Sequence, residues 1–587
     1  MKKIIAYMLI AVLCISLCGC GGNGKQTEET ALETDEQTTE EGTENTEETV
    51  SAEDADNGQE AAKLQILSEA AKEINALPVQ VLDDKYRTFY EVFVYSYCDS
   101  DGDGIGDFSG LTSKLDYIND GNDTTNTDLG CNGIWLMPIM PSPTYHKYDV
   151  TDYYAIDPAY GTLDDFKQFI TECDARGINV IIDMVLNHTS SEHPWFLDAC
   201  KYLQENGELN ETECPSLGYY NFTKEKISDC YYEVPGTEWY YEGRFWSGMP
   251  DLNLANENLR QELQNIAYYW LDMGVSGFRL DAVKEFYSDQ TEANVAFLTW
   301  YNDMVKSHKE DAYLVGEAWV SISTYKQYYE SGIDSFFNFR FADQDGLITS
   351  AVKGAMGENA STYGKVVASL EETFAPHNAN YIDAPFYTNH DMGRSAGYYW
   401  GDYGMAQAKM SSALNLFMNG NAFLYYGEEL GMKGHGIDEN KRAPMQWSSD
   451  AEAEGMCDGP EAMEEMEMTY GSLETQQNDA DSIYSYYKQV IHIRNAFPAI
   501  ARGTVEFLAD QSSEQICILR KTYEEKELLL IYNMSPEEVT VDVSAVTVNG
   551  HGIDADAVKA RLLAIAGSVT ADGSSVTLPA YGIVVAE

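Results

Sequence analysis

Acidic and histidine side chains follow short strand-like runs at four places in this 587-residue chain. Two carboxyl groups that face each other can act as a nucleophile and as a proton donor. Asp281 and Glu317 follow consecutive runs, and Arg279 lies on the same strand face as Asp281 and can keep that carboxylate ionised. The sequence therefore predicts a centre of acid–base or covalent chemistry. The four groups are Asn187-His188, Asp281, Glu317 and Asn389-His390-Asp391.

A second chemical pattern lies between residues 99 and 107. Four carboxylates alternate there with turn-forming glycines, and one backbone carbonyl offers a further oxygen. Hard oxygen ligands with this spacing can wrap one Ca²⁺ ion, as in an EF-hand-like loop. The alternative is an acidic turn that holds no metal. The predicted ligands are Asp99, Asp101, Asp103, Ile105 and Asp107.

Such chemistry needs elements that bring the side chains together. From Tyr90 to about Phe497, short apolar runs alternate with helical stretches, which is typical of βα units around a parallel sheet. Eight such runs predict a (β/α)8 barrel, whose active site lies at the C-terminal ends of the strands. The acids and histidines lie just past those ends, as a barrel requires. The runs are Glu91–Tyr95, Gly133–Met137, Asn179–Met184, Gly277–Leu280, Ala312–Val315, Ser335–Phe337, Ala384–Tyr387 and Ala422–Tyr425.

We therefore predict an α/β fold, a TIM barrel with a small domain inserted after strand 3 and a C-terminal antiparallel β-sandwich. The expected boundaries are 80–188 and 245–500 for the barrel, 189–244 for the inserted domain and 501–587 for the sandwich. The insertion contains Cys200, Cys214 and Cys230, which export would allow to form a disulfide. Free buried cysteines are the alternative.

The N-terminus predicts export. Lys2 and Lys3 precede the apolar run Ile4–Leu17, which is too short to remain as a membrane-spanning helix. The segment that ends at Cys20 resembles the bacterial lipoprotein signal, in which this cysteine is lipidated. An ordinary signal peptide cut nearby is the alternative. We expect residues 1–20 to be the signal and the protein to be lipid-anchored on the extracellular face of a bacterial cell membrane.

Residues 21–79 are expected to form a disordered acidic stalk. Within them, Gln26–Ala62 carries fourteen acidic residues and no Lys or Arg. Such a segment cannot bury enough apolar surface to fold, and its charges repel one another. A low-complexity segment without a function is the alternative. The formal net charge of −59 for the whole chain argues against nucleic acid as a partner, because binding to backbone phosphates requires Lys and Arg.

Five segments resemble the signature regions of the alpha-amylase family of glycoside hydrolases. They occur in the family's order and with suitable spacing. Any one of these motifs is common by itself, whereas five in order are specific. The resemblance covers residues 85–587. The segments are 183–188 (DMVLNH), 249–253 (MPDLN), 277–281 (GFRLD), 316–319 (GEAW) and 389–391 (NHD).

The resemblance implies a role for each residue of the site. Asp281 matches the nucleophile, Glu317 the acid/base, and Asp391 the third carboxylate, which binds sugar hydroxyls. A retaining glycosidase needs its two carboxyl groups about 5–5.5 Å apart, which neighbouring strands can provide. Glu317 has to be protonated near neutral pH, so we expect burial and nearby carboxylates to raise its pKa. The matching substrate-binding residues are Tyr148, His188, Arg279 and His390.

The implied activity is hydrolysis of α-1,4-glucosidic bonds in maltodextrins outside the cell, by a monomer. Tyr145 stands where exo-acting α-glucosidases have an aspartate. Ala282, directly after Asp281, resembles the residue of family members that cleave α-1,4 rather than α-1,6 bonds. Residues 442–447 resemble instead the oligosaccharide-cleaving glucosidases, and Glu285 replaces the histidine usual at a second calcium site. An α-glucosidase or a 4-α-glucanotransferase on the same scaffold, and a non-catalytic glucan-binding lipoprotein, remain as alternatives.

Overall fold

A computed structural model describes residues 52–288 and 290–587. The chain divides into two units, residues 1–56 and residues 57–587. Of the first unit only residues 52–56 are described, as the start of a helix. The predicted signal and its lipidated Cys20 lie outside the described residues.

Seven parallel strands form the curved sheet of the barrel, in the order β10-β1-β2-β3-β7-β8-β9. Side chains alternate across this sheet, so that Phe89, Trp135 and Phe423 pack inside it while Tyr90 and Val92 face the surrounding helices. The strands are β1 (Thr88–Val92), β2 (Gly133–Leu136), β3 (Asn179–Met184), β7 (Gly277–Leu280), β8 (Tyr313–Gly316), β9 (Ser335–Phe336) and β10 (Ala422–Tyr425).

The gap between β9 and β10 is closed by the run predicted as the seventh strand. Ala384 forms a parallel bridge with Phe337, and Phe386 forms one with Phe423. Pro385 between them has no N–H to donate, which prevents a continuous ladder. Its carbonyl still accepts from the N–H of Phe423 at 2.9 Å. The predicted (β/α)8 barrel is thus confirmed, with one strand reduced to single bridges.

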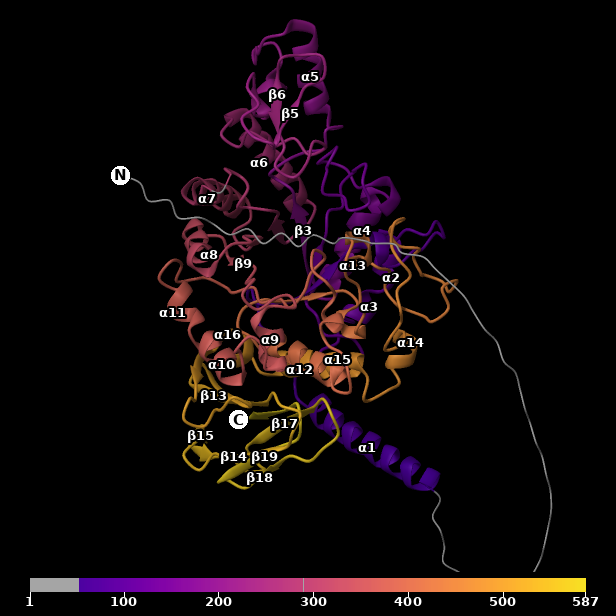
Figure 1. The fold of residues 1–587 in the computed structure, drawn as a ribbon, viewed down its shortest axis with the longest axis vertical. Helices are drawn as coiled ribbons and strands as arrows, with labels where there is room; N and C mark the ends of the chain where they lie inside the picture. Colours follow the sequence, from indigo (N-terminus) through magenta and orange to yellow (C-terminus); the bar gives the residue numbers. More distant parts are fainter. Residues whose placement is uncertain (1–51, 289) are drawn as a thin grey trace, which may run out of the picture. The chain divides into compact units, whose positions relative to one another are not determined.

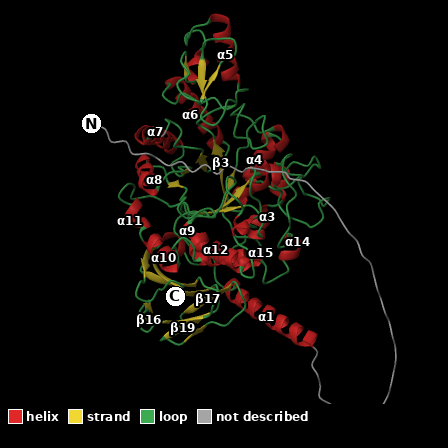
Figure 2. Ribbon diagram, viewed as in Figure 1, coloured by secondary structure: helices red, strands yellow, loops and turns green. Residues whose placement is uncertain are grey.

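Helices surround the barrel strands in the central part of Figure 2. Their sequences carry the expected signals: Thr162 and Asp165 form a capping box at the start of α4, and Asn256 caps α6. The α-helices are α1 (Ala52–Asn75), α2 (Phe108–Ser113), α3 (Leu115–Ile118), α4 (Leu163–Ala175), α5 (Pro194–Asn206), α6 (Glu257–Asp272), α7 (Thr291–His308), α8 (Ile322–Tyr328), α9 (Leu347–Lys353), α10 (Ala360–Ala368), α11 (Leu370–Phe374), α12 (Gly404–Leu416), α13 (Asp438–Lys441), α14 (Leu473–Gln476), α15 (Ile483–Ala496) and α16 (Ala499–Arg502).

The long connection between β3 and α6 contains helix α5 and a small antiparallel sheet of order β4-β6-β5. These elements lie together at the top of Figure 1. The cysteines of this segment are free, as are all eight cysteines of the described residues; Cys214 is buried, whereas Cys200 and Cys230 are half-buried. The three strands are β4 (Phe222–Thr223), β5 (Tyr231–Glu233) and β6 (Tyr240–Glu242).

The C-terminal strands form antiparallel sheets, as predicted. A five-stranded sheet of order β11-β12-β13-β20-β17 and a three-stranded sheet of order β14-β19-β18 share an apolar core that includes Ile518, Ile531, Val576 and Leu578. The strands are β11 (Thr504–Phe507), β12 (Ile516–Tyr523), β13 (Lys526–Asn533), β14 (Val539–Asp542), β15 (Thr547–Val548), β16 (His551–Gly552), β17 (Val558–Leu563), β18 (Thr570–Ala571), β19 (Ser575–Leu578) and β20 (Gly582–Ala586).

Helix α1 corrects one prediction. The sequence predicted a disordered stalk to residue 79, whereas residues 52–75 are helical. Leu67 and Ala70 are buried against Leu563 of the C-terminal strands, and Ile74 is fully buried in the apolar cluster that also contains Tyr90 and Val92. These apolar residues follow the acidic stretch and have a surface to pack on, which is why the helix forms. No helix of the described residues is long and apolar enough to cross a membrane.

Candidate active site

One buried arginine contacts three carboxylates at the centre of the barrel mouth. Nη1 of Arg279 donates to Asp183 at 2.8 Å and to Oδ1 of Asp281 at 2.6 Å. Nη2 donates to Oε2 of Glu317 at 2.7 Å. The guanidinium is fully buried, and its pKa is well above the usual value because the three acids outweigh the penalty of burial. Asp281 and Glu317 are therefore held next to each other by one fixed cation.

Strand register explains why these residues meet. Asp183 of β3 pairs with Arg279 of β7, and Leu280 pairs with Gly316 of β8. Asp281 follows Leu280 and Glu317 follows Gly316, so both acids lie at the same level at the ends of neighbouring parallel strands. The backbone N–H groups of both are still hydrogen-bonded to the adjacent strand. The site is built on strand ends rather than on free loops.

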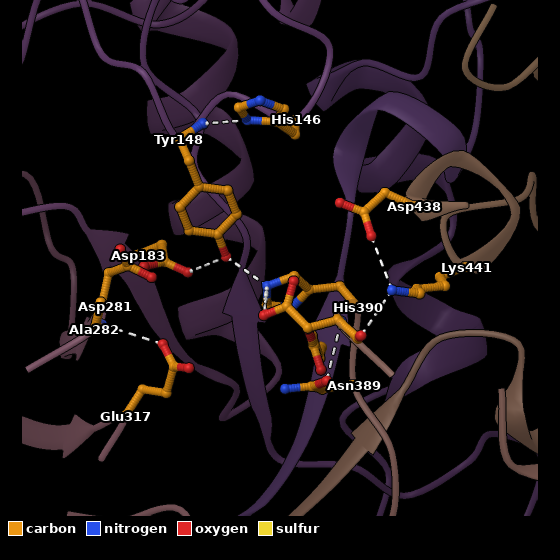
Figure 3. A network of polar contacts seen from close by, with 12 residues as sticks. His146, Tyr148, Asp183, Asp281, Ala282, Glu317, Asn389, His390, Asp438 and Lys441 are labelled. Atoms are coloured by element: carbon orange, nitrogen blue, oxygen red, sulfur yellow. Dashed lines mark hydrogen bonds and ion pairs between the residues drawn. The ribbon is translucent and has the colours of Figure 1, made fainter. Parts of the chain in front are cut away.

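Glu317 lies in surroundings that favour its neutral form. Burial raises its pKa to about 7, since repulsion by Asp281 and Asp391 adds to desolvation and Arg279 opposes it only in part. The N–H of Ala282 donates to its Oε2 at 3.1 Å, a contact drawn in Figure 3. Ala282 has a φ of 45°, a strained value for a residue with a Cβ, and the turn directly after Asp281 thereby aims this N–H at Glu317. The raised pKa expected from the sequence is confirmed.

His390 is held as a cation on the opposite side of the site. Its Nδ1 lies 2.6 Å from Glu91, and its Nε2 lies 2.8 Å from the hydroxyl of Tyr148 and 3.2 Å from Asp391. Burial alone would lower the pKa of His390, but the Asp391 and Glu91 carboxylates raise it to about 9. The Tyr148 hydroxyl in turn donates to Asp183 at 3.0 Å, as Figure 3 shows. A chain of polar contacts thus joins both sides of the mouth.

Asp391 is kept ionised. Burial disfavours its charge, yet His390 and Arg442 hold its pKa well below the usual range. Nη2 of Arg442 contacts Oδ1 of Asp391 at 3.2 Å, and Lys441 binds the Asp391 carbonyl at 2.9 Å. His188 is also buried at the site, where its Nε2 lies 3.2 Å from the Tyr148 carbonyl and burial lowers its pKa.

All seven side chains expected in the catalytic and substrate-binding groups thus lie in one place. Three residues that the sequence did not single out also belong there: Glu91, Asp183 and Arg442. Asp183 begins the signature segment 183–188. Arg442 begins the segment 442–447, which resembles the oligosaccharide-cleaving glucosidases. Glu91 lies within a strand, where a carboxylate is unusual, and that was the available signal.

The acidic loop brings together three of its five predicted ligands. Asp99, Asp101 and Asp107 each place a carboxylate oxygen within 4.8 Å of the others. Asp103 is outside this group, and its Oδ1 accepts from the N–H of Ile105. Three hard, anionic oxygen donors at this separation suit Ca²⁺, so the residues present fit the metal. The loop directly follows η1 (Val94–Ser96), after the first strand.

A (β/α)8 barrel with a buried carboxylate–arginine–carboxylate group at the C-terminal ends of its strands is the arrangement expected of a glycoside hydrolase. The family described as "Alpha amylase, catalytic domain" matches residues 91–503, more than half of the chain. The chain belongs to the alpha-amylase family and is a hydrolase of that family.

Relatives of known name agree with this assignment. Alpha-amylase 3 of Dictyoglomus thermophilum is 36% identical over 462 residues, which are 78% of this chain and 86% of the relative. Glucan 1,6-alpha-glucosidase of Streptococcus pneumoniae is 30% identical, with 77% and 92% covered. The solved structure of Eubacterium rectale Amy13B is 51% identical, superposes with a TM-score of 0.83, and covers 89% of this chain and 98% of its own.

Proposed function

We propose that this protein hydrolyses internal α-1,4-glucosidic bonds of maltodextrins with retention of configuration. The observation that carries the proposal is the Arg279 guanidinium, which contacts Asp281 at 2.6 Å and Glu317 at 2.7 Å. Both carboxyl groups are held by this one cation, and burial together with repulsion by Asp281 and Asp391 raises the pKa of Glu317 to about 7. A carboxyl group that is protonated near neutral pH beside a second carboxyl group is what retaining hydrolysis requires.

The proposed steps of the reaction follow from this arrangement. Glu317 donates its proton to the glycosidic oxygen as that bond to the anomeric carbon breaks. A carboxylate oxygen of Asp281 attacks the same carbon and forms a glycosyl ester. Glu317, now ionised, removes a proton from water, and the water oxygen displaces Asp281 and releases the sugar. Each step transfers one proton or one bonding pair, and both acids return to their initial states.

Four further residues are proposed to bind the sugar at the cleaved bond. The Tyr148 ring can stack on the sugar face, and Asp391 can accept hydrogen bonds from two neighbouring hydroxyls. His390, charged through Glu91 and Asp391, and the neutral His188 can bind further hydroxyls. Arg442 holds Asp391 in place for this contact.

A pocket beside Trp319, two residues after Glu317 in the chain, supports a leaving group longer than one sugar. It has a volume of about 450 Å³ and is lined in part by Trp319, Ile322 and Phe339. Trp319 is 48% exposed and stacks on Phe339 with ring centroids 4.8 Å apart. Because Glu317 protonates the leaving group, a platform two residues beyond it can support the leaving chain. The proposed substrate is therefore longer than a disaccharide.

Digestion of maltoheptaose tests the proposal. Early products of several lengths, formed in the α-anomeric configuration by proton NMR, are expected. Glucose as the sole early product would indicate an α-glucosidase, and products longer than the substrate would indicate a glucanotransferase. Cleavage of isomaltotriose in preference to maltotriose would contradict the α-1,4 assignment, which the 1,6-glucosidase among the relatives makes worth testing.

Replacement of the nucleophile tests the residue assignment. Asp281→Asn should fold as the wild type does and lower kcat by about 10⁴-fold or more, as loss of a covalent nucleophile does elsewhere. More than about a tenth of wild-type activity in the folded variant would contradict the assignment, since no ester could then be the intermediate.

A further inference from the structure

A turn of four exposed residues, 400–403, presents two aromatic rings outside the active site. Trp400 is 78% exposed, the largest fraction among the exposed large apolar side chains of the described residues, and Tyr403 is 43% exposed. Gly401 between them has a φ of 79°, which allows the chain to turn sharply there. A single exposed apolar side chain is ordinary on a protein surface, so the surroundings of the two rings decide whether they form a site.

Buried aromatic residues anchor this turn at both ends. Tyr399, directly before Trp400, is buried, and its hydroxyl accepts a hydrogen bond from the Tyr387 hydroxyl at 2.7 Å. Tyr403 packs against Tyr581, which directly precedes β20 of the C-terminal sheet, with ring centroids 5.8 Å apart. The turn is thus fixed to the barrel at one end and to the C-terminal strands at the other. A platform held in this way loses little conformational freedom when a ligand binds.

A lysine from a neighbouring helix holds the exposed indole. Nζ of Lys353, the last residue of α9, lies 4.9 Å from the ring centroid of Trp400 and 5.4 Å from that of Tyr399. A cation at this distance is attracted to the face of an aromatic ring. Helix α9 packs on α12, which begins directly after the turn, and Figure 1 shows the two helices side by side. The large exposed fraction of Trp400 means that much of the ring stays open to a ligand despite this contact.

The chemistry of the turn suits an uncharged sugar chain. An open aromatic face can stack on the apolar face of a pyranose ring, while the Lys353 ammonium can donate to sugar hydroxyls and the exposed Asp402 carboxylate can accept from them. The net charge of −59 disfavours an anionic partner. The same connection carries Asp391, nine residues before Trp400, and strand-to-helix connections of a barrel lie on its active-site side.

We propose that residues 400–403, together with Lys353, form a second binding site for an α-glucan chain, separate from the active site. A polymer held at Trp400 stays close to the barrel mouth, which raises the effective concentration of its bonds at the catalytic acids. A short oligosaccharide cannot occupy both places and gains nothing from the second site. The choice of ligand rests on the proposed substrate class, whereas binding at Trp400 does not require catalysis.

Association with insoluble starch granules in the cold tests the proposal. Trp400→Ala should weaken granule binding about three- to tenfold, the effect of one lost aromatic contact, and keep kcat/KM for maltotriose within about twofold of wild type. Val81→Ala is the control, because Val81 is 70% exposed in the segment before β1, and it should change neither. Trp400→Tyr retains a ring and should retain most of the binding. Wild-type granule binding by Trp400→Ala, or a Trp400→Tyr variant as weak as Trp400→Ala, would overturn the site.

Two further outcomes separate this proposal from its alternatives. A wild-type dimer that becomes a monomer in Trp400→Ala, by analytical ultracentrifugation, would show that the turn binds a second copy of the chain and would overturn the glucan site. Hydrolysis of maltoheptaose as proposed, together with unchanged granule binding by Trp400→Ala, would overturn only this inference. Loss of granule binding in Trp400→Ala, in a protein that does not cleave maltoheptaose, would support the site and contradict the proposed function.

Discussion

Arg279 binds both of the proposed catalytic acids. It donates to Asp281 through one nitrogen and to Glu317 through another, and it also binds Asp183. A single positive charge cannot neutralise three acids, so the buried groups compete for it. The pKa of Asp183 is raised to about 6 and that of Glu317 to about 7 as a result of burial and this competition. The proposed proton donation by Glu317 would follow from the surroundings that raise its pKa.

The activity of the enzyme should therefore fall as the pH rises through about 7. The reactive form of Glu317 is protonated, and its pKa is raised to about 7, so each pH unit above that value should lower kcat/KM by about tenfold. The profile is measured with a soluble maltooligosaccharide, with stability checked at each pH. Glu317→Gln should remove the alkaline limb along with most of the activity. An alkaline limb below pH 5 would mean that Glu317 is not the proton donor.

At the scale of the elements, the sequence predicted the strands well because each is a short apolar run, and acids or histidines follow four of the runs within a few residues. Asn179–Met184 and Gly277–Leu280 match β3 and β7, and the first strand begins three residues before its predicted start. Pro385 reduces another strand to bridges. The contacts of Glu91 with His390 and of Arg442 with Asp391 could not be predicted from the sequence. The first pair is 299 residues apart and the second 51, and only the closed barrel brings them together.

The acidic loop offers a test at this scale. Ca²⁺ that binds only the folded state stabilises it by about 2.7 kcal/mol at a concentration of a hundred times Kd. Chelation should therefore lower Tm and leave kcat nearly unchanged at temperatures where the enzyme stays folded. Asp101→Asn should abolish this response, because Asp101 belongs to the group of three carboxylates. Asp103→Asn is the matched control and should keep it. A Tm that does not respond to chelator, with no metal by elemental analysis, would show a turn without metal.

At the scale of the whole molecule, α1 joins the segment before the barrel to the C-terminal strands. Glu73 contacts Arg561 at 2.6 Å, Lys63 contacts Asp481 at 2.5 Å, and Ile74 is completely buried. The exposed ion pairs contribute little, whereas burial of one large apolar side chain contributes about 1.5–3 kcal/mol. The helix therefore belongs to the folded body, although the acidic composition just before it predicts a chain that does not fold.

Two truncations distinguish the helix from the acidic segment before it. A chain that begins at residue 57 should have the Tm and kcat of one that begins at residue 21. A chain that begins at residue 77 lacks Leu67, Ala70 and Ile74 and should melt several degrees lower, with Leu563 exposed. Differential scanning calorimetry measures both. Equal melting temperatures for all three chains would mean that α1 does not stabilise the body.

The proposed location at the cell surface depends on Cys20, which follows an apolar run of signal-peptide length. One acyl chain binds membranes only marginally, whereas two anchor a protein stably, and the diacylglyceryl group of a bacterial lipoprotein supplies two. Cys20→Ala should therefore release active enzyme into the medium, while the wild type stays with the membrane fraction. The acidic residues that precede α1 would keep the barrel mouth away from an anionic surface by repulsion, so that it can reach passing maltodextrins. Fractionation of cells that express each form decides the matter: equal amounts of both in the membrane pellet would show that Cys20 carries no anchor.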